Sequence, residues 1–288
     1  MRTISVGHSP DADDIFMYYA IKFGWVSIED TKFENIALDI ETLNQATLKG
    51  IYDICAISFA LYPFVKDDFA LLKTAVSFGE GYGPKLIKKK GMKLKKNFKV
   101  ALSGEFTTNA LLFKIAYPDA RISYMNFLDI ENAVINGDVD AGVLIHESIL
   151  TYSSLLEVER EIWDIWVELC NGEELPLPLG GMCLRRSIPL HEAIKYENAL
   201  IKAVDVANKN RKTLAPMLLE KGLIRVDAVT LDKYLDLYAN DNSVKMSQIQ
   251  YKALNKLFEL GYKSGHYQNL IKAEDFLIPS EYEELRAR

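Results

Sequence analysis

The strongest constraint on the fold is the alternation of short apolar segments with helical segments along the first part of the chain. Residues 3–8 alternate like a strand, and Ser9-Pro10 then supplies a capping residue and a proline suited to the first helical position. Strands are predicted again at 37–41 and 52–58, with a short helical segment between them. Because parallel strands are joined by crossover helices, this order predicts a largely parallel sheet covered by helices.

The middle of the chain repeats this organisation and predicts a second unit of the same class. Strands are predicted at 98–102, 122–126 and 141–145, with helical segments between them. Residues 79–84 and 175–181 contain Gly and Pro and are typical of crossings between two units.

Two crossings imply that one domain is inserted into the other. We expect a large discontinuous α/β domain of residues 1–88 and 180–288 and a small inserted α/β domain of residues 89–179. The predicted fold class is therefore α/β, with two domains, two interdomain crossings and a central cleft. Functional residues are expected in that cleft, where strand C-terminal ends and helix N-termini converge.

Composition excludes several classes of function. The 288 residues carry a net charge of −6, which argues against nucleic acid as the main partner. The eight lysines of residues 85–99 then predict a solvated hairpin. Three cysteines without a CxxC spacing predict neither a disulfide framework nor a zinc site. With no apolar leader at the N-terminus and no run of about 20 apolar residues, we expect a cytoplasmic protein.

A histidine follows the predicted strand 141–145 directly. His146 stands in the stretch GVLIHESILTY, at the carboxyl end of an apolar run. One interpretation is a hydrogen-bonded residue that closes the strand. The other is a general base or acid, since imidazole titrates near neutral pH. A zinc motif of the HExxH type is excluded, because Leu150 occupies the place of the second histidine.

Two further segments place small polar side chains at element ends. Thr107, Thr108 and Asn109 follow a Gly-containing turn and open a helix, where backbone N–H groups can bind an anion or a carboxylate. Ordinary N-capping by one of the threonines is the alternative. Ser58 ends the strand 52–58, so its hydroxyl either faces the same cleft or caps the next helix.

Three carboxylates cluster after Ser9-Pro10. Asp11, Asp13 and Asp14 suggest a metal site, but in the first turn of a helix they also complement the helix dipole. We favour the dipole interpretation and expect no metal.

Together these motifs resemble those of the 1,4-dihydroxy-6-naphthoate synthase family of menaquinone biosynthesis by the futalosine pathway. The matching stretches are residues 9–16 (SPDADDIF), 41–44 (ETLN), 58–60 (SFA), 81–84 (GYGP), 104–108 (GEFTT), 145–148 (IHES), 151–152 (TY) and 175–180 (LPLPLG). The family commonly begins Ser-Pro-Cys-Pro-Asn-Asp. This chain has aspartate in place of the Cys and the Asn, at Asp11 and Asp13, while Asp14 keeps its place.

The resemblance implies a periplasmic-binding-protein-like fold of type II, used as an enzyme. It implies a lyase that converts cyclic dehypoxanthinyl futalosine to 1,4-dihydroxy-6-naphthoate and dihydroxyacetone without a cofactor or metal. The family's histidine base falls on His146. Its substrate-contacting segments fall on Ala56, Ile57, Ser58, Thr107, Thr108 and Asn109. Three further candidate site residues are Asp14, Asn44 and Tyr152.

Three other functions compete with this expectation. A solute-binding protein of the same fold would bind a small molecule without chemistry. A chorismate dehydratase-like enzyme of the same pathway is expected to lack the HES…TY stretch. A regulatory effector-binding domain would need an attached DNA-binding helix-turn-helix. A small-molecule substrate is the expected partner, and the sequence leaves a homodimer open.

Overall fold

The computed structural model describes residues 2–280 and contains two β-sheets. In the six-stranded sheet the order is β2-β1-β3-β11-β4, with β5 paired to β11. The strands are β1 (Arg2–His8), β2 (Thr31–Ala37), β3 (Ile54–Ser58), β4 (Phe69–Leu71), β5 (Ser77–Gly79) and β11 (Leu177–Arg185). The pairs β1–β2 and β1–β3 are parallel, as the alternation of strands and helices predicted, whereas β11 runs antiparallel to its neighbours.

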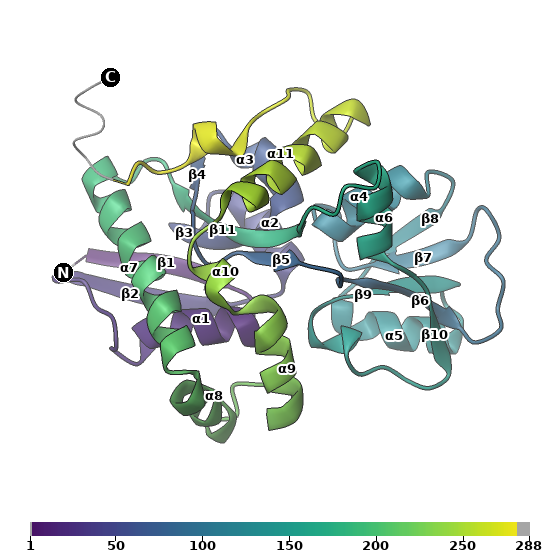
Figure 1. The fold of residues 1–288 in the computed structure, drawn as a ribbon, viewed down its shortest axis with the longest axis horizontal. Helices are drawn as coiled ribbons and strands as arrows, with labels where there is room; N and C mark the ends of the chain where they lie inside the picture. Colours follow the sequence, from purple (N-terminus) through teal and green to yellow (C-terminus); the bar gives the residue numbers. More distant parts are fainter. Residues whose placement is uncertain (1, 281–288) are drawn as a thin grey trace.

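The five-stranded sheet has the order β10-β6-β9-β7-β8. Its strands are β6 (Lys85–Lys89), β7 (Lys99–Leu102), β8 (Arg121–Tyr124), β9 (Ala141–Leu144) and β10 (Leu156–Glu161). The pairs β7–β8 and β7–β9 are parallel, and β6 and β10 are antiparallel additions. Helices α4 (Thr108–Ala116), α5 (Phe127–Asn136) and α6 (Ile162–Leu169) accompany this sheet (Figure 1).

The remaining helices surround the six-stranded sheet. Helix α2 packs on β3 and β1, α1 packs against α7, and α9 contacts both α1 and β5. Figure 1 shows these helices grouped on one side of the molecule. They are α1 (Ala12–Lys22), α2 (Ile40–Leu48), α3 (Tyr62–Val65), α7 (Leu190–Lys209), α8 (Arg211–Glu220), α9 (Ala228–Tyr238), α10 (Asp241–Val244) and α11 (Gln248–Lys263).

The chain passes twice between the two sheets. It crosses from β5 to β6 and returns from α6 to β11 (Figure 1). We call the part built on the six-stranded sheet the large lobe and the part built on the five-stranded sheet the small lobe. Since β6 pairs with β9 and β10, we propose that the first boundary lies near residue 84, before the expected residue 88. We place the second before β11 begins at residue 177.

The second strand was predicted too late in the sequence. Strand β2 covers Thr31–Ala37 and pairs with all of β1, so residues 38–41 are not part of it. Instead Asp39 caps α2, because its carboxylate accepts a hydrogen bond from the Thr42 amide at 3.1 Å. Of residues 37–41, only Ala37 therefore belongs to a strand, while Asp39 is the N-cap of α2 and the helix begins at Ile40.

Helix α1 also begins later than expected. Its first residue is Ala12 and its N-cap position is Asp11, so Ser9 and Pro10 precede the helix. The side chain of Asp11 makes no capping hydrogen bond, which leaves its carboxylate available for other contacts.

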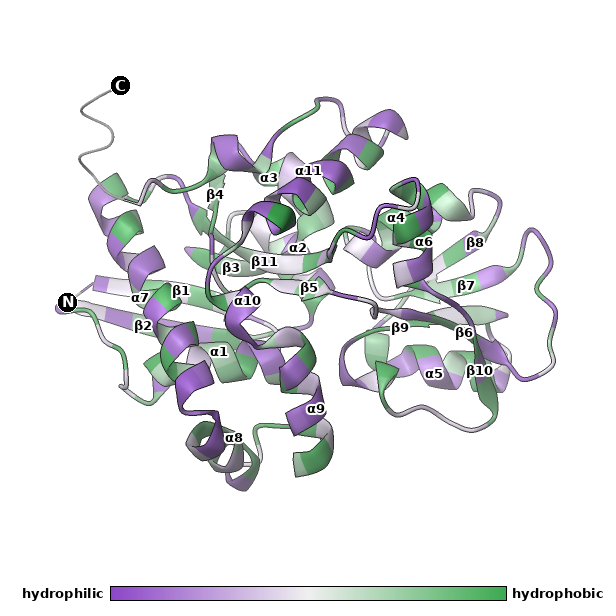
Figure 2. Cartoon of the chain, viewed as in Figure 1, coloured by the Kyte–Doolittle hydropathy of each residue, from purple (hydrophilic) through white to green (hydrophobic). Residues whose placement is uncertain are grey.

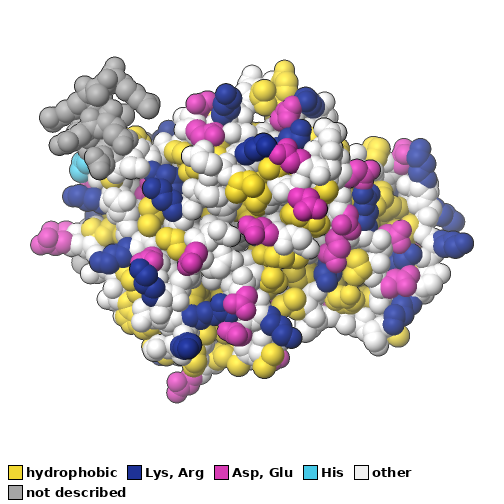
Figure 3. Space-filling model, in the orientation of Figure 1, with side chains coloured by type: hydrophobic (Ala, Val, Ile, Leu, Met, Phe, Trp, Pro, Cys, Tyr) yellow, Lys and Arg dark blue, Asp and Glu magenta, His cyan; other side chains and the backbone are white. Residues whose placement is uncertain are grey.

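Each sheet has a buried apolar core. Strand β3 is buried along its whole length, and β9 is equally buried. Figure 2 shows hydrophobic residues concentrated in the central strands, and Figure 3 shows positive and negative side chains interspersed over the visible face. Among residues 2–280, no helix combines the length and the apolar character needed to span a bilayer.

Helix α5 packs closely against β9 at a glycine. A Cβ atom added at Gly142 would lie 2.4 Å from Ile130 Cγ2 and 3.1 Å from Val134 Cγ2. Such an approach is tighter than van der Waals contact, so a larger residue would push α5 away from the strand that leads to His146.

We predict that Gly142→Ala destabilises the fold by about 1–3 kcal/mol, because it overpacks the interface between α5 and β9. Urea unfolding measures the change. In an Ile130→Ala background the same substitution should cost less, since the clashing Cγ2 atom is gone. Equal costs in both backgrounds would contradict this account of the packing.

Candidate active site

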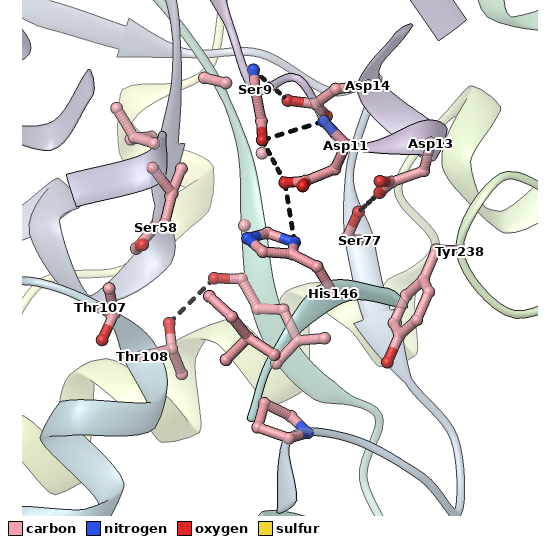
Figure 4. A pocket seen from close by; sticks show the side chains of 18 of the residues that line it. Ser9, Asp11, Asp13, Asp14, Ser58, Ser77, Thr107, Thr108, His146 and Tyr238 are labelled. Carbon is pink, nitrogen blue, oxygen red and sulfur yellow. Dashed lines mark hydrogen bonds and ion pairs between the residues drawn. The ribbon is translucent and has the colours of Figure 1, made fainter. Parts of the chain in front are cut away.

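A pocket lies between the two lobes and is lined by residues from both. The large lobe contributes the ends of β1 and β3 and the first half of β11, and the small lobe contributes the N-terminus of α4 and the end of β9. Figure 4 shows these groups facing a common space. The lining residues are Ser9, Asp11, Asp13, Asp14, Ile40, Ala56, Ile57, Ser58, Ala75, Ser77, Pro84, Thr107, Thr108, Asn109, Ile145, His146, Leu179, Gly180, Gly181, Tyr234 and Tyr238.

His146 projects into this pocket from a strained backbone position. Strand β9 ends at Leu144, and His146 starts a single 3₁₀ turn with φ of 55°, a left-handed conformation uncommon outside glycine. Residues held in such conformations cluster at functional sites, where the surrounding structure fixes them. The turn re-aims the chain so that the imidazole faces the large lobe (Figure 4).

The two nitrogens of His146 have different environments. Nδ1 lies 2.8 Å from Oδ2 of Asp11, across the gap between the lobes (Figure 4). Nε2 is buried and has no hydrogen-bond partner among the residues that the structure describes. The ring of Phe127 packs edge-on against the imidazole at 4.9 Å between centroids. This arrangement holds one nitrogen and leaves the other available to a bound molecule.

The contact with Asp11 changes the pKa of both groups. Burial lowers the pKa of His146, but the attraction and hydrogen bond of Asp11 outweigh it and raise the pKa to about 9. Burial alone would raise the pKa of Asp11, yet His146 holds it below its ordinary value. At neutral pH the two groups therefore form an imidazolium–carboxylate pair.

The same shifts link the stability of the fold to pH. Because the pKa of His146 is raised on folding, its contribution is complete below the ordinary value of 6.5 and is lost as the pH rises through about 9. Because the pKa of Asp11 is lowered, its contribution is present above the ordinary value of 3.8 and is lost on acidification.

The three aspartates have separate partners. Asp13 accepts a hydrogen bond from Ser77 Oγ at 2.8 Å, and Asp14 accepts one from the Ser9 amide at 2.8 Å. Burial raises the pKa of Asp13 to about 6 and that of Asp14 well above its ordinary value, and neighbouring carboxylates add to both shifts. A protonated form of Asp13 is therefore accessible near neutral pH.

The N-terminus of α4 forms the opposite wall of the pocket. Thr107 caps the helix by accepting from the Ala110 amide at 3.3 Å, so the capping interpretation applies to this residue. The first two helical residues, Thr108 and Asn109, also line the pocket. Thr108 Oγ1 donates to the Leu179 carbonyl at 3.0 Å and accepts from the Ala60 amide at 3.3 Å, which joins the two lobes.

Two of the residues expected to assist lie outside the pocket lining. Asn44 is buried behind Ser58, donating to its Oγ at 3.2 Å and accepting from its amide at 3.0 Å, so it orients Ser58. Tyr152 does not line the pocket and lies under Lys85, with Nζ 5.9 Å from the ring centroid. Asp14 and the six substrate-contact candidates all line the pocket: Ala56, Ile57, Ser58, Thr107, Thr108 and Asn109.

Several lining residues were not predicted from the sequence. Tyr234 and Tyr238 are one turn apart on α9, in the helical last third where no motif was found. Asp11 was noticed only as part of an acidic cluster. The sequence offered two signals, the spacing of Tyr234 and Tyr238 by one helical turn and an aspartate at the start of a helix. Neither signal indicates a pocket by itself.

Comparisons with known proteins place the chain in a family. Residues 4–263 match the protein family described as menaquinone biosynthesis. The chain belongs to this menaquinone biosynthesis family. Two curated relatives are named 1,4-dihydroxy-6-naphthoate synthase. The one from Streptomyces coelicolor is 29% identical over 270 residues, which cover 91% of this chain and 94% of the relative. The one from Thermus thermophilus is 28% identical over 268 residues, with 90% and 93% covered.

Solved structures confirm the predicted periplasmic-binding-protein-like fold. A crystal structure of a protein from Archaeoglobus fulgidus is 33% identical with a TM-score of 0.85, covering 92% of this chain and 98% of that protein. The ligand-binding component of an ABC-type import system from Staphylococcus aureus has a TM-score of 0.70 at 13% identity, with 99% of each chain covered. The periplasmic aliphatic sulphonate-binding protein of Escherichia coli has 0.62 at 12% identity, with 96% and 92% covered.

We predict that Asp11→Asn reverses the pKa shift of His146. In the wild type, NMR of the imidazole should show a pKa of about 9. The substitution removes the attraction while the burial remains, so the pKa should fall below the ordinary value of about 6.5. A variant that still titrates near the wild-type value would show that Asp11 is not the cause.

Proposed function

We propose that the protein is a lyase that converts cyclic dehypoxanthinyl futalosine to 1,4-dihydroxy-6-naphthoate and dihydroxyacetone, with His146 as the general base. The name of the two curated relatives and the family match support the product. The observation that carries the role of His146 is its buried, unpartnered Nε2 atom inside the pocket, with Nδ1 held by Asp11.

The geometry suits removal of a proton from a bound substrate. Loss of a proton from the spirocyclic substrate to Nε2 would begin ring opening, and formation of the aromatic naphthalene would drive the reaction. Asp11 fixes the tautomer and stabilises the imidazolium that results. Because the pKa of His146 is about 9, the neutral form is a strong base but a minor species at neutral pH.

The opposite wall is suited to binding the rest of the substrate. The amides of Thr108 and Asn109 lie at the N-terminus of α4 and would hold the substrate carboxylate. Ser58, oriented by Asn44, and the protonated form of Asp13 can donate hydrogen bonds to hydroxyl or carbonyl groups. Closure of the lobes around the substrate would exclude water and fix the reacting geometry.

We further propose a cytoplasmic enzyme that needs no metal or redox cofactor. The three cysteines are free and buried, as a reducing compartment allows. The proposed chemistry is proton transfer followed by bond cleavage, and the side chains of the pocket supply both the base and the hydrogen-bond donors.

Two alternatives have support from particular observations. The fold is shared with solute-binding proteins, which favours binding without chemistry. The family description also suits a chorismate dehydratase-like enzyme of the same pathway. Dehydration of added chorismate would support the chorismate dehydratase-like enzyme. A futalosine derivative that binds and is recovered unchanged would support binding without chemistry.

We predict that His146→Gln lowers kcat for naphthoate formation by about 100- to 10,000-fold, the usual contribution of a general base. Because the substitution also breaks the buried ion pair with Asp11, the variant should be less stable, and circular dichroism checks that it remains folded. Liquid chromatography with mass detection measures the product. His191→Gln is the matched control, since His191 is exposed on α7 and should leave the rate unchanged. Equal turnover by the two variants would remove His146 from its role.

We predict that kcat/KM rises with pH up to about pH 9, because His146 must be neutral to accept a proton. Asp11→Asn should move the rise to lower pH and reduce the maximum rate, since the base becomes weaker and loses its orientation. A rate that instead falls through this range would indicate that the imidazolium acts as an acid.

A further inference from the structure

One cation outside the substrate-binding residues contacts three groups next to His146. Arg225 lies in the connection between α8 and α9. Its Nη2 atom donates to Asp11 Oδ1 at 2.6 Å and to Glu147 Oε2 at 3.4 Å. Its guanidinium carbon lies 5.2 Å from the ring centroid of Phe127, the ring that packs against the imidazole. Arg225 therefore contacts the hydrogen-bond partner of the proposed base, the ring that packs edge-on against it, and its neighbour in the sequence.

These contacts join the two lobes. Asp11 and Arg225 belong to the large lobe, because α1, α8 and α9 pack together there. Glu147 and Phe127 belong to the small lobe, beside β9 and at the start of α5. A further bond crosses the same gap, from the Ala12 amide to Glu147 Oε1 at 3.1 Å. The arginine is thus the centre of one interlobe contact group. Thr108 forms another, and the Phe106 amide, which donates to Glu41 Oε2 at 3.2 Å, forms a third.

The oxygens of Asp11 are divided between two partners. Oδ1 accepts from Arg225, and Oδ2 faces His146 Nδ1 and also accepts from Ser9 Oγ. A carboxylate held at Oδ1 cannot rotate freely, so its second oxygen is kept in the plane needed by the imidazole. The side chain of Asp11 is 1% exposed, which leaves water little access to replace either partner.

We propose that Arg225 is a positioning residue, which clamps Asp11 and Glu147 together across the cleft and so holds His146 with Nε2 toward the pocket only when the lobes are closed. The catalytic consequence rests on the proposed function, whereas the geometric role does not. Opening of the cleft would separate Asp11 from His146 and return the imidazole to an ordinary proton affinity.

The charges around the imidazole make this role measurable. The charged groups around it are Asp11, Asp13 and Asp14 from the large lobe and Glu147 from its own turn, and Arg225 contacts Asp11 and Glu147. If Arg225 acted only through its charge, its removal would raise the pKa of His146, because a cation repels the imidazolium. If it positions Asp11, its removal lowers that pKa, because the attraction weakens while burial remains.

The test is titration of His146 by NMR in the full chain, together with kcat and KM for naphthoate formation. Arg225→Gln should lower the pKa from about 9 and reduce kcat by about 10- to 100-fold, with a smaller change in KM. Arg225→Lys keeps the charge but not the forked donors, so it should restore part of both values. Arg211→Gln is the control: Arg211 pairs with Asp232 and Asp236 on the outer face of α9, and both values should stay at wild type.

Two results would overturn the proposal: a pKa of His146 that is unchanged or higher in Arg225→Gln, or a kcat within about twofold of wild type. If Arg225→Gln does not fold, the same criteria apply to Arg225→Lys, with a partial fall of the pKa as the supporting result. A wild type that makes no naphthoate would contradict the proposed function alone, because the titration requires no substrate.

Discussion

The pairing of Asp11 with His146 across the cleft is the interaction on which the site depends. Asp11 is buried and only 18% of the His146 side chain is exposed, so each charge depends on the other for its stability. The pair forms only when the end of β1 and the end of β9 approach each other, so the position of the lobes and the proton affinity of the imidazole are coupled. The strained turn at His146 is maintained by this contact and by the packing of Phe127.

The fold delivers these groups through a simple property of parallel strands. Their carboxyl ends share one edge of a sheet, so Ser9 and Ser58 meet in the large lobe, and His146 meets the start of α4 in the small lobe. The position of these residues at the strand ends was predicted from the alternation of strands and helices and from the polar residue at each strand end. The boundaries were less certain, because the apolar residues of 37–41 suit both a strand and a capped helix start.

The partners of the strand-end residues could not be predicted from the sequence. Asp11 and His146 are far apart in the chain, and nothing local distinguishes a carboxylate that pairs across a cleft from one that complements a helix dipole. The same holds for Arg225 and Tyr234, which belong to a helical region without a motif. The resemblance to the naphthoate synthase family also could not supply Asp11, because Cys is common there. The carboxylate partner of the proposed base was therefore found only in the structure.

The measurement that tests the central claim most directly is the product balance of the purified wild-type protein with cyclic dehypoxanthinyl futalosine. The account predicts that 1,4-dihydroxy-6-naphthoate and dihydroxyacetone appear in equal amounts as the substrate disappears, with no added metal or redox cofactor. A substrate that binds in the pocket and is recovered unchanged would contradict the account and indicate a binding protein of the same fold.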